Sequence, residues 1–459
     1  MTDHNGASDA LVFFGATGDL AYKKIFPALQ ALAKRGKLDF PVIGIGRSQW
    51  NNEQFRARAK DSLETHGQLD EAAFKVLAST MRYIDGDYND AATYKNLREQ
   101  LGAATRPLHY LAIPPSAFGT VVKGLAGAGC TQSARVVLEK PFGRDLRSAC
   151  ALNETLHTAF DESRIFRIDH YLGKESVQNL ALFRFANTFL EPIWNRNYVH
   201  SVQITMAEKI GVEGRGRFYE EAGAVRDVVQ NHMLQVVSLL AMEPPAPSYR
   251  EAIRDEQVKT LRSVRPLTKE DIVRGQFRGY RQEAGVAPDS RVETFAALRL
   301  HIDAWRWEGV PFYIRVGKCL PTSATEVLVT LKRPPMFELP AQAANHVRFK
   351  LSPDVIIALG ARVKKPGDEM STEPIELKLV QQPSSDARGA YERLLGDAME
   401  GDSILFARQD GVEAAWNVVE RVLDRELPLH DYETGSWGPK QADELIAADG
   451  GWHDPESGS

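Results

Sequence analysis

Apolar residues follow two different patterns along this chain of 459 residues. In the first third, short continuous apolar runs predict buried strands. These runs occupy residues 11–14, 41–46, 81–84, 108–113 and 135–138. Between the first two, Ile25, Leu29 and Leu32 recur at helical spacing. A strand, a glycine-containing loop, a helix and a second strand form a βαβ unit, which predicts a parallel sheet with right-handed crossovers.

The second part of the chain shows a period of two instead. Val202, Ile204 and Met206 alternate with polar neighbours, and residues 298–302 and 375–379 repeat the pattern. Such alternation predicts half-buried strands of a large antiparallel sheet. A helix is expected over 222–242, and the polar tail from residue 449 is expected to fray.

The fold class is therefore α/β followed by α+β. We expect an N-terminal Rossmann-type domain over residues 1–168 and a larger domain with a mainly antiparallel sheet over residues 169–459. A chain of 459 residues is long for a single core.

Composition narrows the class of protein. The chain is 43% hydrophobic and 25% charged, as in globular proteins, and its net charge of −5 argues against a nucleic-acid partner. No apolar run approaches membrane-spanning length, and the first ten residues do not resemble a signal peptide. Cys130, Cys150 and Cys319 suggest neither a disulfide framework nor a metal site, so we expect a cytoplasmic protein without a metal.

The loop after the first strand is a candidate dinucleotide site. Glycines there let the backbone approach a pyrophosphate at the start of a helix, although tight turns also need glycine. The candidate contacts are Gly15, Thr17, Gly18, Asp19 and Leu20. After the second strand, Arg47 stands where an NAD site usually carries an acid. Arginine can pair with a 2′-phosphate, which favours NADP; the alternative is a solvated arginine.

Charged groups are dense in the segment 167–175. His170 and Lys174 are four residues apart and would share one face of a helix, an arrangement that suits a phosphate group. Asp169 could orient a base elsewhere in the chain. The alternative interpretation is a solvated charged turn.

A base candidate lies in the helix expected over 222–242. His232 falls on an apolar face of valines, where a histidine is more often a core residue than a catalyst. Asp227 adds a carboxylate on the same helix. Glu208 ends one strand, and Lys318 follows another at 312–316. Each of these could be a surface group or a ligand contact.

Several segments, taken in order, resemble the motifs of the glucose-6-phosphate dehydrogenase family, bacterial type. They are G-x-x-G-D-L-A at 15–21, E-K-P-F-G at 139–143, R-I-D-H-Y-L-G-K-E at 167–175, D-x-x-Q-N-H at 227–232, V-P-F-x-x-R-x-G-K at 310–318 and Y-E-T-G-S-W-G-P at 432–439. The resemblance covers nearly the whole chain. The match at 167–175 is the most specific, because it runs through nine consecutive residues of unusual composition.

The resemblance implies oxidation of D-glucose 6-phosphate to 6-phospho-D-glucono-1,5-lactone with hydride transfer to NADP, the first oxidative step of the pentose phosphate pathway. NAD is implied as a weaker alternative, and a homodimer or homotetramer as the assembly. The implied catalytic residues are His232 as general base and Asp169 as its partner. The implied substrate contacts are His170, Tyr171, Lys174, Glu208, Asp227, Lys318 and Lys140. Further implied cofactor contacts are Arg47, Asp87, Tyr88 and Lys140.

One position departs from the family pattern. A second lysine often follows the position of Lys318, but here the residue is Ser323. Lys140 precedes proline in a bond that the family holds in the cis form.

Two other functions stay open. A dehydrogenase of a non-phosphorylated sugar would share the Rossmann domain, but it would not need the pair His170 and Lys174. A non-catalytic NADP-sensing protein would be expected to lose Asp169 or His232, and both are present.

Overall fold

The computed structural model describes residues 6–247, 249, 251–335, 344–368, 371–380 and 388–456. The chain forms two compact units, each with its own sheet. The first comprises Met1–Lys174 with Asp386–Glu413, and the second comprises Glu175–Ser385 with Ala414–Ser459. The chain therefore returns to the first unit late in its course. The domain boundary expected after residue 168 did not include this return.

The first unit contains a six-stranded parallel sheet of order β3-β2-β1-β4-β5-β6. Its strands are β1 (Ala10–Phe14), β2 (Val42–Gly46), β3 (Met81–Asp85), β4 (Pro107–Leu111), β5 (Arg135–Glu139) and β6 (Ile165–Ile168). Its helices are the π-helix η1 (Ala21–Ile25), α1 (Phe26–Lys34), α2 (Asn52–His66), α3 (Glu71–Thr80), α4 (Ala91–Leu101), α5 (Phe118–Gly127), α6 (Leu146–His157) and α11 (Ala390–Glu400). The expectation of a Rossmann-type sheet is confirmed.

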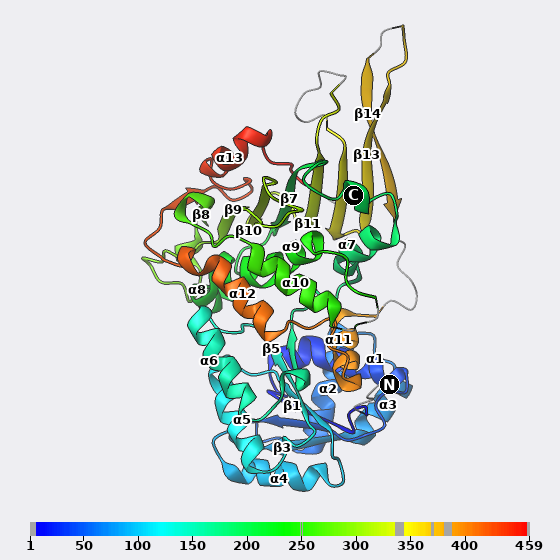
Figure 1. The fold of residues 1–459 in the computed structure, drawn as a ribbon. Coiled ribbons are helices and arrows are strands. Elements are labelled where there is room, and N and C mark those ends of the chain that lie inside the picture. Colours follow the sequence, from blue (N-terminus) through cyan, green and yellow to red (C-terminus); the bar gives the residue numbers. More distant parts are fainter. Residues whose placement is uncertain are drawn as a thin grey trace. The chain divides into compact units, whose positions relative to one another are not determined.

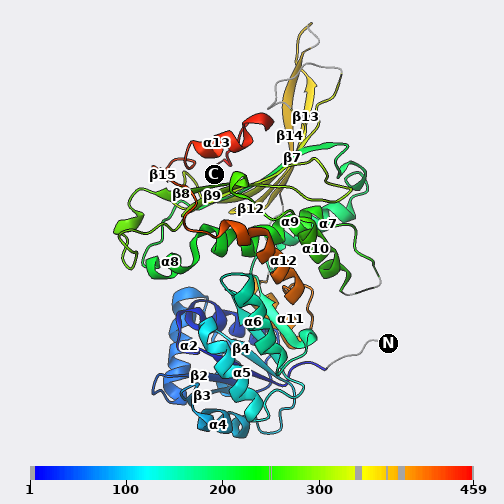
Figure 2. The same cartoon turned by 60° about the vertical axis from the view of Figure 1, so that its left-hand side comes forward.

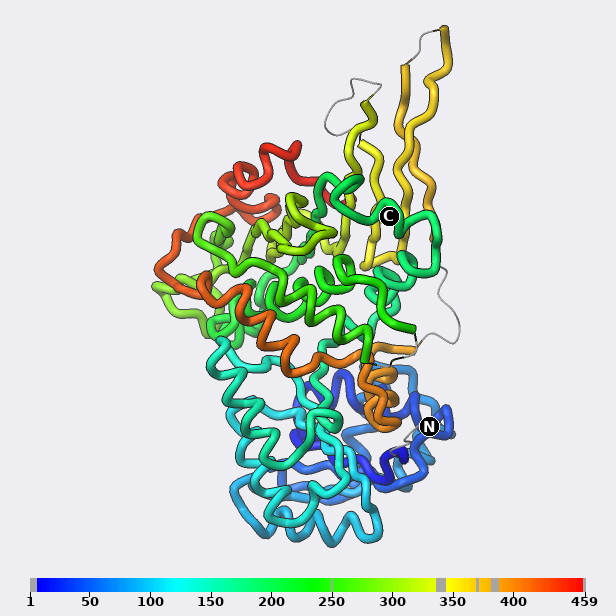
Figure 3. Tube along the Cα trace, in the orientation of Figure 1, coloured from blue at the N-terminus to red at the C-terminus, as the bar shows by residue number. Residues whose placement is uncertain are grey.

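Helices cover both faces of this sheet (Figure 1). Leu11 and Phe13 of β1 pack in one core with α1, α2, α3 and α11, and α5 with its neighbours α4 and α6 lies on the other face. Figure 3 shows the returning segment, in orange, beside the blue helix α1, which it contacts. Because β1 is covered on both sides, it is a continuous apolar run, as expected for a central parallel strand.

The second unit contains a nine-stranded sheet of order β14-β13-β12-β11-β7-β10-β9-β8-β15. Its strands are β7 (Val199–Ala207), β8 (Ile272–Phe277), β9 (Phe295–Leu300), β10 (Phe312–Gly317), β11 (Ala324–Leu331), β12 (His346–Ser352), β13 (Ile356–Lys364), β14 (Thr372–Val380) and β15 (Leu429–Tyr432). Neighbours pair antiparallel except β7 with β10 and β8 with β15, which are parallel. The expected sheet is thus present, with two parallel pairs added.

The helices of the second unit are α7 (Glu175–Ala186), α8 (Gly216–Ala224), the π-helix η5 (Val225–Met233), α9 (Leu234–Ala241), α10 (Ala252–Ser263) and α13 (Gln441–Ile446). The helix α12 (Gln409–Val419) carries the chain from the first unit into the second. Figure 2 shows α9 and α10 on one side of the large sheet and α13 on the other. The single helix expected over 222–242 is therefore three consecutive helices, with a π-helical centre.

Strand β7 differs from its expected half-buried state. Its polar side chains Ser201, Gln203 and Thr205 are all buried, as are Val202 and Ile204. The tail after α13 covers the polar face: the Gln203 amide donates to the Gly451 carbonyl at 3.2 Å and accepts from the His453 N–H at 2.8 Å. The expectation that this tail frays is wrong as far as residue 454, since Asp454 also pairs with buried Arg315 at 2.8 Å.

Candidate active site

The glycine loop lies where the strand order of the parallel sheet reverses, between β1 and β4. Ligands of such sheets bind in the crevice at this point, beyond the carboxyl ends of the strands. Gly15 has a φ of +78°, and a side chain there would lie 2.1 Å from the Ala112 carbonyl oxygen. Only glycine fits this turn, which then leads through Thr17, Gly18, Asp19 and Leu20 into the π-helix η1.

Tyr88 fixes the backbone of this loop through a hydrogen bond. Its side chain is buried, and its hydroxyl accepts a hydrogen bond from the Gly15 N–H at 2.9 Å. The Arg47 guanidinium lies 5.2 Å from the Tyr88 ring centre and 3.4 Å from an Asp87 carboxylate oxygen. The structure therefore gathers the predicted cofactor residues at one end of the sheet, with Arg47 exposed and Tyr88 largely inaccessible to a ligand.

The segment between β6 and α7 is a pair of turns and not a helix, so the helical face expected for His170 and Lys174 is wrong. The Leu172 N–H donates to the Asp169 carbonyl, and the Lys174 N–H donates to the Tyr171 carbonyl, each at 3.0 Å. Asp169 is fully buried and accepts the Tyr171 N–H at 2.9 Å. The turns still bring the predicted groups together. The Lys174 ammonium lies 3.9 Å from the Tyr171 ring centre, and the His170 ring packs edge-on against the Tyr171 ring.

Several lysines meet at these turns. Burial lowers the pKa of Lys174, the charges of Lys140 and Lys24 lower it further, and the Asp169 carboxylate opposes the shift. Lys24, on η1, was not singled out from the sequence, although its place in the helix that follows the glycine loop is a usable signal. Clustered ammonium groups repel one another, and a multiply charged anion can relieve that repulsion.

The backbone position of Lys140 depends on the preceding residue, Glu139. The half-buried Glu139 carboxyl accepts hydrogen bonds from the hydroxyls of Tyr110 and Tyr391, and desolvation raises its pKa. Tyr391 comes from α11, so the returning segment helps to fix this strand end. The bond between Lys140 and Pro141 is cis.

The second unit assembles its own group of predicted residues. The Lys318 ammonium bonds to the Glu208 carboxylate at 2.6 Å and lies 5.3 Å from the ring centre of Tyr219. The pKa of Tyr219 is raised well above its ordinary value by burial and by the charges of Asp227 and Glu208. Tyr219 therefore lies among the predicted sugar contacts, yet no pattern in the sequence marks it.

The π-helix η5 carries both Asp227 and His232. Residues five apart lie one turn apart in a π-helix, whereas an α-helix would turn them to different sides. His232 is 2% exposed and lies among the buried valines that the sequence placed beside it. π-helical turns occur often at functional sites.

Ser323, at the position where the family often has a lysine, has a structural partner. Its hydroxyl accepts the N–H of Lys209 at 3.0 Å, next to Glu208. The side chain thus fixes the end of β7 and supplies no cation.

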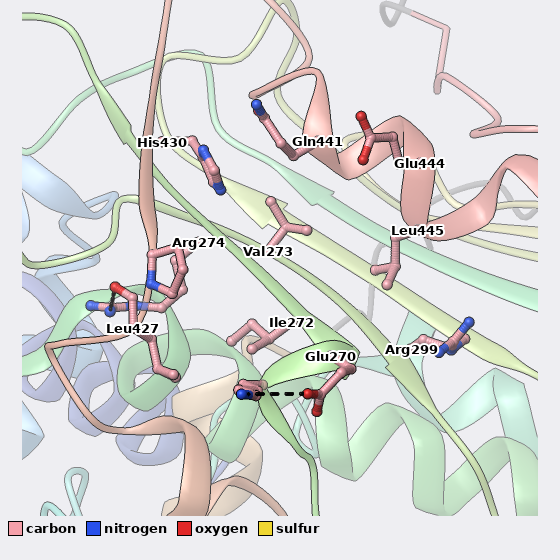
Figure 4. A pocket seen from close by; sticks show the side chains of 12 residues that line it. Glu270, Ile272, Val273, Arg274, Arg299, Leu427, His430, Gln441, Glu444 and Leu445 are labelled. Carbon is pink, nitrogen blue, oxygen red and sulfur yellow. Dashed lines mark hydrogen bonds and ion pairs between the residues drawn. The ribbon is translucent and has the colours of Figure 1, made fainter.

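A separate cavity of about 390 Å³ lies in the second unit (Figure 4). It is lined from β8, β15 and α13 by residues that include Arg274, His430 and Glu444. Within the described part of the chain, none of the predicted site residues lines this cavity. Among the described residues, every helix is too short or too polar to cross a lipid bilayer.

The glycine loop at the reversal of a parallel sheet, followed by a unit with a large mixed sheet, defines a nicotinamide-dinucleotide-dependent oxidoreductase. Comparison with known proteins identifies the family. The model of "Glucose-6-phosphate dehydrogenase, NAD binding domain" matches residues 12–179, and that of "Glucose-6-phosphate dehydrogenase, C-terminal domain" matches residues 181–453. The chain belongs to the glucose-6-phosphate dehydrogenase family.

Individual relatives agree with this assignment. Glucose-6-phosphate 1-dehydrogenase 1 of Mycobacterium tuberculosis is 42% identical over 98% of this chain and 97% of its own length. The crystal structure of glucose-6-phosphate 1-dehydrogenase from Mycobacterium avium superimposes with a TM-score of 0.92 at 42% identity, covering 99% of this chain and 100% of that one. A glucose-6-phosphate dehydrogenase in complex with its substrate glucose-6-phosphate gives a TM-score of 0.90 at 35% identity, with 99% and 100% coverage.

Proposed function

We propose that this protein oxidises D-glucose 6-phosphate to 6-phospho-D-glucono-1,5-lactone and reduces NADP. The observation that carries the proposal is the lysine cluster at the turns after β6. The Lys174 ammonium lies 3.9 Å from the Tyr171 ring centre, burial lowers its pKa, and repulsion from Lys140 and Lys24 lowers the pKa further. A phosphate dianion would relieve this repulsion, whereas an uncharged sugar would not. His170 and Tyr171, on the same turns, complete the phosphate contacts.

The chemistry divides between two groups of residues. With a nicotinamide dinucleotide bound to accept the hydride from the anomeric carbon, His232 would take the proton of the anomeric hydroxyl, and the Asp169 carboxylate would orient and stabilise the imidazolium. The group of Glu208, Asp227 and Lys318 positions the sugar, together with Lys140. A general base of this kind contributes about 10²–10⁴-fold in rate.

The cofactor proposed is NADP, with NAD as a weaker alternative. Arg47 is exposed at the end of β2 and can pair with a 2′-phosphate, because it presents several N–H donors in a fixed plane. A site built for the 2′-hydroxyl of NAD would carry an acceptor there instead.

The assembly proposed is a homodimer or homotetramer. Strand β14 is the last strand of the large sheet, and within the described part of the chain it pairs with β13 alone. It exposes a row of apolar side chains, in which Leu377 is 58% and Leu379 is 53% exposed. An apolar row on an edge strand is a surface that proteins usually cover. The location proposed is the cytoplasm, where the free thiols of the cysteines stay reduced.

One assay tests the reaction against its alternatives. Reduced nicotinamide is followed with glucose 6-phosphate or free glucose, and with NADP or NAD. We expect kcat/KM to be far higher for glucose 6-phosphate with NADP than for any other pair. Equal kcat/KM for free glucose would favour a dehydrogenase of a non-phosphorylated sugar. Binding of NADP without turnover of either sugar would favour a sensor.

A further inference from the structure

The Lys318 ammonium is placed by an unusual corner of the chain. Strand β10 ends at Gly317, and the two residues that follow leave the sheet direction at once. Cys319 has a φ of +53°, a left-handed conformation that a residue with a side chain adopts at a cost. Such a conformation persists only where the surrounding structure fixes it.

Tyr432 supplies one of the contacts that fix the corner. It ends β15, its side chain is 3% exposed, and its hydroxyl donates to the Lys318 carbonyl at 2.7 Å. The Thr294 hydroxyl lies 3.0 Å from the Tyr432 hydroxyl oxygen and itself accepts the Phe277 N–H at 2.9 Å. Since the Tyr432 proton is used on Lys318, Thr294 donates to Tyr432, and the chain of hydrogen bonds has one direction.

Further backbone bonds complete the corner. The Gly435 N–H donates to the Cys319 carbonyl at 2.7 Å, and the Lys318 N–H donates to the Thr294 carbonyl at 3.0 Å. The Cys319 N–H donates to the Ile210 carbonyl at 3.1 Å. Both carbonyls of the corner thus accept hydrogen bonds from residues 432–435. The two N–H groups of the corner donate to Thr294, just before β9, and to Ile210, just after β7.

We propose that Tyr432 is a positioning residue, which sets the reach of the Lys318 ammonium toward Glu208 and the sugar through its hydrogen bond to the Lys318 carbonyl. The inference rests on the proposed function, because it takes Lys318 as a substrate contact. The ammonium stands on a flexible stem of four carbons, so its position depends on where the backbone starts that stem. Burial raises the pKa of Tyr432, which keeps its hydroxyl protonated as a donor.

The test compares Tyr432→Phe with the unaltered protein in steady-state kinetics. Phenylalanine keeps the ring and removes only the donor. We expect KM for glucose 6-phosphate to rise about threefold to tenfold, the effect of one lost hydrogen bond, while kcat and KM for NADP change little. Tyr313→Phe is the matched control, because that hydroxyl on β10 donates to Asp449, which lies outside residues 432–435 and outside the corner.

A double substitution separates positioning from general stability. In a Lys318→Ala background, Tyr432→Phe should add no further rise in KM, because the group that it positions is gone. If the rises in KM caused by Lys318→Ala and Tyr432→Phe instead multiply in the double variant, the proposal is overturned. A folded Tyr432→Phe protein with unchanged KM would overturn it as well. If Tyr432→Phe does not fold, Thr294→Val decides in its place: an increased KM supports positioning, and an unchanged KM overturns it.

The same data tell the two proposals apart. An unaltered protein that does not oxidise glucose 6-phosphate defeats the proposed function before any variant is compared. An active protein in which Lys318→Ala raises KM but Tyr432→Phe does not keeps the proposed function and defeats only the positioning role.

Discussion

At the scale of single residues, the proposed reaction depends most on the imidazole of His232. A buried histidine keeps a ring nitrogen for a substrate only where its surroundings fix the other one. His232→Asn keeps a polar group but removes the base, so we expect kcat to fall about 10²-fold or more while the substrate Kd stays similar. Asp169→Asn should lower kcat as well, because the imidazolium loses its carboxylate.

Steady-state kinetics together with a substrate-binding titration measure both effects. His200→Asn serves as the control, since His200 is an exposed histidine of the same unit. A His232→Asn protein that folds, binds glucose 6-phosphate and retains nearly normal kcat would show that His232 is a core residue.

The choice of cofactor is also decided at one residue. Arg47→Ala removes a charge that only the 2′-phosphate needs. We expect KM for NADP to rise about tenfold, equivalent to about 1.5 kcal/mol, the low end for a charged hydrogen bond because Arg47 is 61% exposed. KM for NAD should hardly change.

Initial rates with each coenzyme measure the difference. Arg58→Ala is a matched control, because Arg58 is a partly exposed arginine of α2 that stacks on Tyr22. Equal losses with NADP and NAD in Arg47→Ala would exclude recognition of the 2′-phosphate.

Residue types were predictable where local rules decide them. Gly15 is required by its positive φ, and a glycine there follows from a strand-loop-helix pattern that the sequence displays. Tyr219 and Tyr391 were not predictable, because their roles arise from distant partners: Tyr219 faces Asp227 and Glu208, and Tyr391 reaches Glu139 across the first unit. No local pattern encodes such contacts.

At the scale of elements, two π-helical segments carry residues of the proposed site. Lys24 lies on η1, and Asp227 and His232 lie on η5. A hydrophobic period distinguishes a helix from a strand but not a π-helix from an α-helix over so few residues. This is why the sequence predicted a helix over 222–242 correctly and missed its π-helical centre.

The turns after β6 allow a prediction about pH. The pKa of Lys174 is lowered, chiefly by burial, so its ammonium loses its proton at a lower pH than a free lysine does. Because the neutral amine binds phosphate poorly, kcat/KM for glucose 6-phosphate should fall on the alkaline side below the ordinary lysine pKa. Lys174→Arg keeps its charge at such pH and should move this limb upward.

Profiles of kcat/KM against pH measure this effect, since they report the free enzyme. Lys174→Ala should greatly reduce kcat/KM for glucose 6-phosphate and leave the slow reaction with free glucose almost unchanged. An alkaline limb that is the same in Lys174→Arg, or equal losses with both sugars in Lys174→Ala, would place Lys174 outside the phosphate site.

At the scale of the whole molecule, the division into two sheets was visible in the change of apolar period near residue 200. The return of residues 386–413 to the first unit was not, because α11 has an ordinary amphipathic pattern that does not name its partner. The C-terminal tail shows the same limit, since its polar sequence suggested fraying although Asp454 pairs with the buried Arg315. Long-range pairing is decided by partners that a local pattern does not specify.

The free edge of the large sheet gives the last prediction. In β14, Leu377 and Leu379 lie on one side of the strand and are both more than half exposed, so in the proposed oligomer we expect them to contact a second copy of the chain. Leu377→Glu together with Leu379→Glu would place two charges in that contact, and an unpaired buried charge strongly disfavours association. We expect the unaltered protein to be a dimer or tetramer by light scattering coupled to size-exclusion chromatography, and the double variant to be smaller.

Leu182→Glu is the control, because Leu182 is a leucine of α7 that is 60% exposed, and this substitution should leave the mass unchanged. A double variant with the same mass as the unaltered oligomer, or an unaltered protein that is monomeric at high concentration, would show that this edge does not mediate assembly.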